Sequence, residues 1–200
     1  MAMPYRECLA VLAAQRRDEL VVTSAGNSSE LWHGITGDTE RTFYLEASMS
    51  MASLFAAGIA EGIPEAQVWA FSGDGAFCMN PGMLMVERDM DLPNLKHFLL
   101  SNRAYGSTSN VPLPGRAGND YAAIARGFGI ERVWSFETLG GLEQGFDEAV
   151  RSPGHGVIVL ELEPVTGKHG SPPMDGPEVK FRFGRYIERT YRRTLFSAPV

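Results

Sequence analysis

The sequence predicts a single α/β domain of three layers, with helices on both faces of a mainly parallel sheet. Two short apolar runs, residues 68–71 and 95–100, each end in turn-forming residues, as buried strands do. Between them, Asn80 and Pro81 suit the start of a helix over residues 83–90. A strand, a helix and a strand in this order form a crossover with parallel strands. The 200 residues of the chain are enough for one such core.

Apolar periodicity and turn residues place the other elements. We expect strands at residues 20–24, 132–136 and 157–163, and helices at residues 6–15, 47–60, 121–128 and 142–150. The apolar stretch 49–63 is too short and too interrupted for a membrane span, so it is interpreted as a buried helix. Residues 1–165 are predicted to form the folded domain. Residues 166–200 are predicted to form a loop and a basic, aromatic helix or tail that docks on a neighbouring chain.

Composition and charge exclude several classes of function. Hydrophobic residues make up 44% of the chain and charged residues 21%, which is typical of a soluble globular protein. A net charge of -6 argues against general attraction to nucleic acids or membranes. Two cysteines, Cys8 and Cys78, provide no disulfide framework, and no signal segment opens the chain. We expect a cytoplasmic protein with no nucleic-acid or membrane partner.

Polar side chains follow two strands of the predicted sheet. Asp74 and Asn102 are expected at the carboxyl ends of these strands, the edge where open α/β sheets bind ligands. Carboxylate and amide oxygens suit Mg2+, which usually keeps substrate phosphates among its ligands. Gly73 and Gly75 allow close approach of the backbone, whose amides bind phosphate. The residues therefore predict a Mg2+-diphosphate site.

The motif Gly73-Asp74-Gly75, followed some two dozen residues later by Asn102, resembles the diphosphate-binding domain of thiamine diphosphate (ThDP) enzymes. This resemblance implies the ThDP-binding fold for residues 1–165. It implies that Asp74, Asn102 and the Ala104 carbonyl hold Mg2+. The cofactor contacts that it implies are Ala47, Met49, Gly73, Asp74, Gly75, Ala76, Asn102, Ala104, Tyr105 and Gly106.

A third element of the resemblance is the segment 47–52, which lies upstream of Asp74 at the distance of a Gly-Ser-Met-Gly-like segment in the family. The resemblance implies that Met49 props the cofactor into a V shape. It also implies that the Ala47 carbonyl and the Met49 amide hold the aminopyrimidine. Ala47 and Ser50 replace the usual glycines, so the match is weaker if the backbone there requires positive φ angles.

The segments 107–110 and 120–125 narrow the resemblance to the cofactor-binding chain of the two-subunit sulfopyruvate and phosphonopyruvate decarboxylases. In these enzymes a glutamate of a separate pyrimidine-binding chain completes the site. The resemblance therefore implies a heteromeric 2-oxo acid decarboxylase, most simply a heterotetramer, acting on a pyruvate with an acidic group on carbon 3. Glu46 lies on the wrong side of the pattern for the catalytic glutamate.

Other reactive residues receive weaker interpretations. His33 follows the first strand and is a candidate for substrate contact, since loops after strands carry function. His97 is interpreted as structural, and His155 and His169 have no evident partner. Cys8 and Cys78 are interpreted as packing residues. Arg103 is expected either to assist with phosphate or substrate charge or to point to solvent.

Two alternative functions remain at this stage. The same cofactor chain can serve a carboligase or a 2-oxo acid oxidoreductase, which a ligated or acceptor-dependent product would reveal. A non-catalytic Mg2+-phosphate binding module would bind diphosphate without the thiazolium. A haloacid-dehalogenase-type phosphatase is disfavoured because no second aspartate follows Asp74, and a nicotinamide site because no Gly-x-Gly-x-x-Gly follows a strand.

Overall fold

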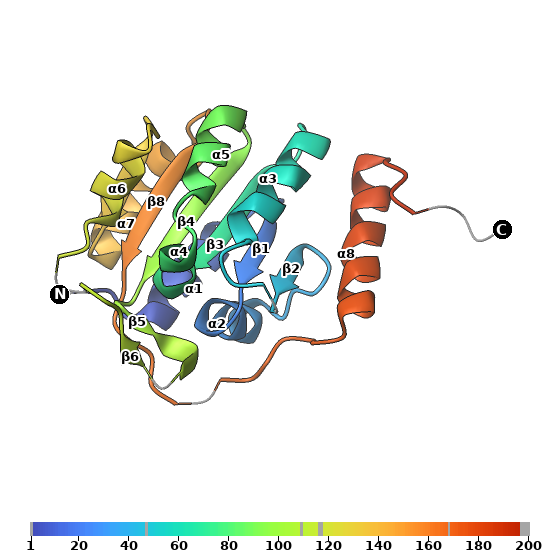
Figure 1. Cartoon of the computed structure of the whole chain (residues 1–200). Coiled ribbons are helices and arrows are strands. Elements are labelled where there is room, and N and C mark those ends of the chain that lie inside the picture. The colour runs from blue at the N-terminus through green and yellow to red at the C-terminus, as the bar shows by residue number, and fades with distance from the viewer. Residues whose placement is uncertain (1, 47, 109, 116–117, 168, 197–200) are drawn as a thin grey trace.

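The computed structural model describes residues 2–46, 48–108, 110–115, 118–167 and 169–196, which form a sheet covered by helices on both faces (Figure 1). The main sheet has six strands in the order β2-β1-β3-β4-β8-β7, and every neighbouring pair is parallel. Its strands are β1 (Leu20–Ser24), β2 (Thr42–Leu45), β3 (Val68–Gly73), β4 (Leu95–Ser101), β7 (Val133–Phe136) and β8 (Gly156–Glu161). This confirms the predicted α/β class with a mainly parallel sheet.

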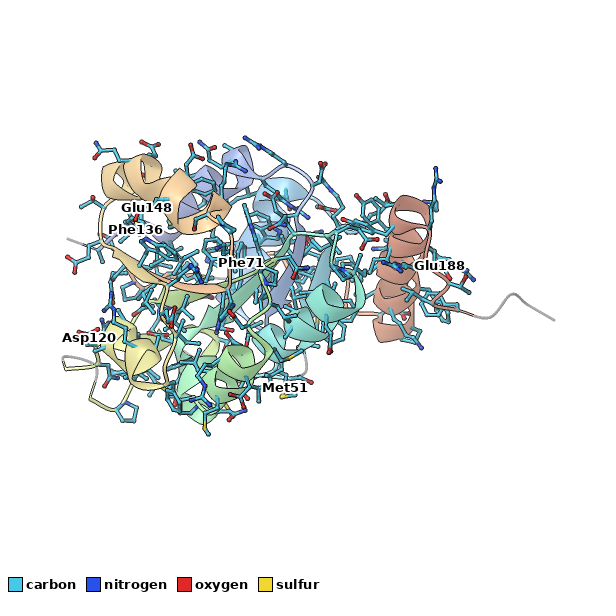
Figure 2. The ribbon with its side chains drawn as sticks, turned by 90° about the horizontal axis from the view of Figure 1, so that it is seen from above. Met51, Phe71, Asp120, Phe136, Glu148 and Glu188 are labelled. Carbon is cyan, nitrogen blue, oxygen red and sulfur yellow. The ribbon has the colours of Figure 1, made fainter. Side chains whose placement is uncertain are left out.

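Helices cover the two faces of the sheet in separate groups. One face packs against α1 (Tyr5–Gln15), α2 (Asn27–Thr36) and α7 (Leu139–Phe146), and the other against α3 (Ala52–Gly62), α5 (Met83–Met90) and α6 (Tyr121–Gly127). Alternation along β3 explains the split, because Trp69 and Phe71 enter the first core while Val68 and Ala70 enter the second. Figure 2 shows Phe71 in the middle of these layers.

Short elements complete the chain near the carboxyl ends of the strands and after α7. The helix α4 (Asp74–Met79) follows β3 directly, and β5 (Ala104–Tyr105) pairs with β6 (Val111–Pro112) in a two-stranded antiparallel sheet. The turn η1 (Gly106–Thr108) lies between β5 and β6, and a π-helical turn, η2 (Asp147–Arg151), extends α7.

The structure corrects several sequence-based boundaries. The sequence pattern missed α2, β2 and α4. The helix α3 begins at Ala52 rather than at residue 47, and α5 begins at Met83 with Gly82, not Asn80, as its N-cap. The missed helix α2 buries two serines, Ser28 and Ser29, whose hydroxyls donate to the Ser24 carbonyl. Because half of the buried residues of α2 are serines, its apolar periodicity is too weak to detect.

The C-terminal helix α8 (Gly176–Tyr191) packs on this chain's own β2 edge. Val179, Phe183 and Ile187 recur every four residues and are buried, so they form one apolar stripe. Phe183 meets Phe43 of β2 with the ring centroids 5.5 Å apart. The outer face includes the exposed Phe181, and docking of the tail on a neighbouring chain stays a prediction. Within the ranges given above, no helix is both long and apolar enough to cross a membrane.

Candidate functional site

The carboxyl ends of β1, β3 and β4 meet around one small pocket of about 40 Å³. Its wall includes every predicted cofactor contact that the structure describes, whereas Ala47 lies outside the described residues. The lining residues are Tyr5, Ala25, Asn27, Ser28, Met49, Gly73, Asp74, Gly75, Ala76, Leu100, Asn102, Ala104, Tyr105, Gly106 and Ser107. Segments far apart in the sequence thus converge at the edge where parallel sheets bind ligands.

Asp74 is the first residue of α4, and its side chain is almost completely buried. Its Oδ1 accepts a hydrogen bond from the Gly75 amide at 2.9 Å, and its Oδ2 accepts one from the Arg103 amide at 2.7 Å. Burial raises the pKa of Asp74 to about 6, although both amides act to lower it. A buried carboxylate held by backbone amides gains stability from a bound cation, because the cation replaces the lost hydration.

Asn102 lies directly after β4 and is buried beside Asp74 in the same pocket. Its Oδ1 accepts a hydrogen bond from the Ala104 amide at 3.2 Å, which folds the turn 102–104 back on itself. The Leu113 amide donates to the Arg103 carbonyl at 3.2 Å, so Ala104 and Pro112 form the next, non-hydrogen-bonded pair, and the ladder does not engage the Ala104 carbonyl. The pocket therefore gathers carboxylate, amide and carbonyl oxygens, the hard ligands that Mg2+ prefers.

The glycines of the pocket differ in how much space they need. A Cβ on Gly75 would lie 2.7 Å from Cδ1 of Tyr105, and a Cβ on Gly106 would collide with the Asn27 side chain. A Cβ on Gly73 would meet nothing within 4 Å, and Gly73 has an ordinary extended backbone. Close packing therefore disfavours a side chain at Gly75 and, unless the Asn27 side chain moves, at Gly106, whereas Gly73 has room for a Cβ.

Met49 lines the pocket, as the sequence predicted, and Ser50 next to it has a φ of +68°. Serine rarely adopts this left-handed conformation, which glycine adopts without cost. The backbone therefore has a positive φ at the position where the Gly-Ser-Met-Gly-like segment of the family carries glycine. Ser50 adopts this angle at a cost in strain. A positive φ at Ser50 was the condition under which the resemblance of the segment 47–52 to the family is weaker, and this condition is met.

The structure does not bring His33 to the pocket. His33 lies in α2, not in a loop, and its ring packs edge-on against Tyr44 with the centroids 5.5 Å apart. Arg103 neither lines the pocket nor points freely to solvent, because Glu161 binds its guanidinium at 2.6 Å. Cys8 is buried as expected, but Cys78 is exposed, so a packing role for Cys78 is wrong.

Sequence reasoning missed part of the wall, chiefly Tyr5, Ala25, Asn27, Ser28, Leu100 and Ser107. One signal for this part is the turn after β1, where Gly26 has a φ of +87° and Asn27 opens α2. Among the described residues, the Asn27 Nδ2 is buried without a hydrogen-bond partner. A buried unpaired donor facing a pocket favours an anionic or carbonyl-bearing ligand.

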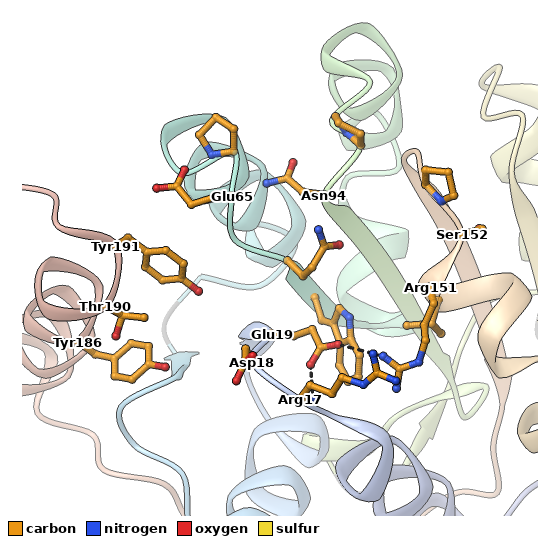
Figure 3. A pocket seen from close by; sticks show the side chains of 16 residues that line it. Arg17, Asp18, Glu19, Glu65, Asn94, Arg151, Ser152, Tyr186, Thr190 and Tyr191 are labelled. Carbon is orange, nitrogen blue, oxygen red and sulfur yellow. Dashed lines mark hydrogen bonds and ion pairs between the residues drawn. The ribbon is translucent and has the colours of Figure 1, made fainter.

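A larger cavity, of about 680 Å³, lies at the opposite edge of the sheet, between α8 and the amino ends of the strands (Figure 3). Several of its polar groups are already bound within the chain. Glu19 accepts from the Arg17 amide and pairs with Arg151, and the Asn94 amide donates to three carbonyls at the end of α3. We therefore interpret its polar lining as structural and place the candidate site at the carboxyl edge.

A second buried charge cluster lies away from the pocket. Glu87 of α5 contacts His97 of β4 at 3.0 Å and His155 at 3.2 Å, all three almost fully buried. Burial acts to raise the pKa of Glu87, but the positive charge of His97 and the hydrogen bonds of both histidines outweigh it and hold the pKa at about 2. His97 is therefore structural, as expected, whereas the expectation that His155 has no partner is wrong.

The fold and this carboxyl edge are those of a thiamine diphosphate enzyme. The chain belongs to the family described as "Thiamine pyrophosphate enzyme, C-terminal TPP binding domain", whose model matches residues 24–161. It is 31% identical over 173 residues to the protein named sulfopyruvate decarboxylase subunit beta of Methanocaldococcus jannaschii, covering 86% of this chain and 90% of that one. The protein of the same name from Methanococcus maripaludis is 28% identical over 189 residues, covering 94% and 100%.

A solved structure shares the fold. The thiamine diphosphate-dependent 4-hydroxybenzoylformate decarboxylase of Rhodococcus jostii RHA1 superimposes with a TM-score of 0.68 at 17% identity. The match covers 83% of this chain but 34% of that one, so this chain spans about a third of that enzyme's length.

Proposed function

We propose that this chain binds thiamine diphosphate through Mg2+ and is the cofactor-binding subunit of a heteromeric 2-oxo acid decarboxylase. The observation that carries the proposal is the buried Asp74 carboxylate, whose two oxygens accept hydrogen bonds from backbone amides beside Asn102. Asp74, Asn102 and the Ala104 carbonyl would hold the metal. The carboxylate, amide and carbonyl oxygens of these residues are suitable ligands for a hard divalent cation.

The residues of this chain would bind and orient the cofactor. Bound thiamine diphosphate supplies an electron sink for the loss of carbon dioxide from a 2-oxo acid. The backbone amides after Asp74 and the buried Asn27 amide group would hold the diphosphate. Met49 offers apolar bulk at the pocket wall, where it would fix the shape of the cofactor.

We propose that a second chain binds the pyrimidine ring and supplies the catalytic glutamate, most simply in a heterotetramer. Support comes from the relatives' names, which call each a subunit beta. Exposed apolar side chains near the pocket also favour a covering partner. They include Met51 just before α3, Phe55 on α3 and Met79 at the end of α4.

The proposed substrate is a pyruvate with an acidic group on carbon 3, such as sulfopyruvate or phosphonopyruvate. The names of the curated relatives support sulfopyruvate. A carboligase or a 2-oxo acid oxidoreductase built on the same cofactor chain is the alternative, because the pocket of this chain fits the cofactor rather than one outcome of its chemistry. A non-catalytic Mg2+-phosphate module is the remaining, less favoured alternative.

Assays of the chain with and without its partner test the proposed function. The purified chain should not decarboxylate any 2-oxo acid, because the pyrimidine half of the site comes from the partner. Adding the partner, ThDP and Mg2+ should release carbon dioxide and a free aldehyde, and light scattering should show a larger symmetric complex. Robust turnover by the chain alone, free of contaminating decarboxylase, would contradict the split site. A ligated or acceptor-dependent product would favour the alternative reaction.

A further inference from the structure

The turn that carries two of the proposed metal ligands contains a strained residue. Arg103, between Asn102 and Ala104, has a φ of +60°. A residue other than glycine pays about 1–2 kcal/mol for this left-handed conformation. The conformation directs the Arg103 amide to Oδ2 of Asp74 at 2.7 Å. Some other contact must therefore hold Arg103 in this shape.

Glu161, the last residue of β8, makes that contact. Its Oε1 accepts from Nη2 of Arg103 at 2.6 Å, and its Oε2 accepts from Nε at 3.1 Å. This two-pronged geometry is the strongest pairing of a guanidinium with a carboxylate. Oε2 also accepts from the Ser101 hydroxyl at 3.1 Å, so the same carboxylate holds both sides of Asn102.

Neighbouring contacts fix the arginine further. The guanidinium carbon lies 5.0 Å from the centre of the Tyr121 ring, and Nη1 donates to the Asn119 carbonyl. Ser101 and Glu161 are also direct neighbours in the parallel pairing of β4 and β8. These contacts link β8 to the turn 102–104. No residue of β8 lines the pocket, whereas Asn102 and Ala104 of the turn do.

We propose that Glu161 is a positioning residue for the Mg2+ site and acts through Arg103, an inference that rests on the proposed function. Glu161 keeps the 102–104 turn in its strained shape and supplies the guanidinium with a counter-charge. Without that carboxylate, the guanidinium keeps its contacts with Asn119 and Tyr121, but its charge, which acts on Asp74, is no longer balanced by Glu161 and competes with the divalent cation. The turn also loses the contact that offsets its strain.

The test is calorimetric titration of ThDP into the full chain over a series of Mg2+ concentrations. Glu161→Gln should lower the apparent Mg2+ affinity by about tenfold or more, the size expected for an outer contact of a metal ligand. The double variant Arg103→Gly, Glu161→Gln should restore most of that affinity. Glycine accepts the positive φ without strain and removes the competing cation.

Asp38→Asn is the matched control, because it breaks another ion pair of 2.6 Å, with Arg16, away from the pocket. It should leave the Mg2+ affinity unchanged. If Glu161→Gln does not fold, Arg103→Gly is compared with the double variant, and equal affinities are expected. Unchanged Mg2+ affinity in Glu161→Gln, or a double variant as weak as Glu161→Gln, would overturn the inference. A wild-type chain without Mg2+-dependent ThDP binding would overturn the proposed function as well.

Discussion

Two buried carboxylates of this chain, Asp74 and Glu87, have opposite electrostatics. Asp74, at the carboxyl edge of the sheet, accepts hydrogen bonds from two backbone amides, and burial raises its pKa to about 6. Glu87, nearer the amino edge, lies between His97 and His155, and its pKa is held at about 2 even though burial acts to raise it. Each side chain is about 1% exposed, so burial alone does not explain the difference.

The difference separates a ligand site from a structural ion pair. Glu87 has its counter-charges within the chain, so the cluster is complete once the chain has folded. The burial of Asp74 is offset mainly by two backbone amides and only in smaller part by the charge of Arg103, which is itself paired with Glu161. A cation from solution would offset the remaining cost of burial. A buried charge without a direct ion pair among the described residues thus points to function, whereas a buried charge in a direct ion pair points to stability.

Removing either proposed metal ligand should have the largest effect. Asp74→Ala and Asn102→Ala should each weaken Mg2+-dependent ThDP binding by more than the roughly 10–100-fold typical of outer contacts. Calorimetric titration measures this. Glu87→Gln is the control at the other carboxylate and should bind the cofactor normally under conditions in which it is folded. Unchanged affinity for ThDP and Mg2+ in both pocket variants would contradict the metal site and leave Asp74 with only a turn-forming role.

Glu87→Gln should instead lower the stability of the chain. Because the pKa of Glu87 falls from 4.5 to about 2 on folding, the ion pair stabilises the chain by up to about 3 kcal/mol above pH 4.5. That contribution is lost as the pH falls from about 4.5 through about 2. Urea unfolding of the wild type and Glu87→Gln should therefore differ more at pH 5 than at pH 2. A difference that does not change with pH would contradict this account.

Substitutions of Met49 test whether the pocket around Asp74 has the proposed function. Met49→Leu should retain activity in the assembled enzyme, because leucine keeps the apolar bulk. Met49→Gly should lose most of it, about tenfold or more, since the proposed role needs volume and not sulfur. Steady-state kinetics at saturating cofactor separates the two, and equal rates would make Met49 an ordinary core residue.

The smallest effect is expected at Ser50, where strain is stored beside the pocket. Ser50→Gly should stabilise the chain by about 0.5–1 kcal/mol, because glycine removes the cost of the positive φ but adds some entropy to the unfolded chain. Ser50→Ala keeps the unfavourable angle and serves as the control without gain. Urea unfolding at neutral pH measures both, and a loss of stability in the glycine variant would contradict the strain.

Local signals in the sequence were enough to predict the central strands of the sheet and the positions of Asp74 and Asn102 at their ends. The strands β1, β3 and β4 are apolar runs with turn residues at their ends, which is the pattern of buried parallel strands. Asp74 and Asn102 follow two of these strands, so their proximity depends only on the strands being parallel neighbours. The helix α2 escaped detection because its buried face is partly serine, and serine carries no apolar period.

The sequence by itself determined the class of fold, the edge that carries the pocket and the meeting of Asp74 with Asn102 there, because parallel crossovers bring strand ends together whatever the intervening loops contain. Only the tertiary structure decided which polar groups are paired. It placed Glu161 on Arg103, 58 positions apart in the chain, and His97 and His155 around Glu87. Such pairs depend on the register of the strands and on side-chain packing between layers. Residue spacing in a single sequence therefore does not predict them.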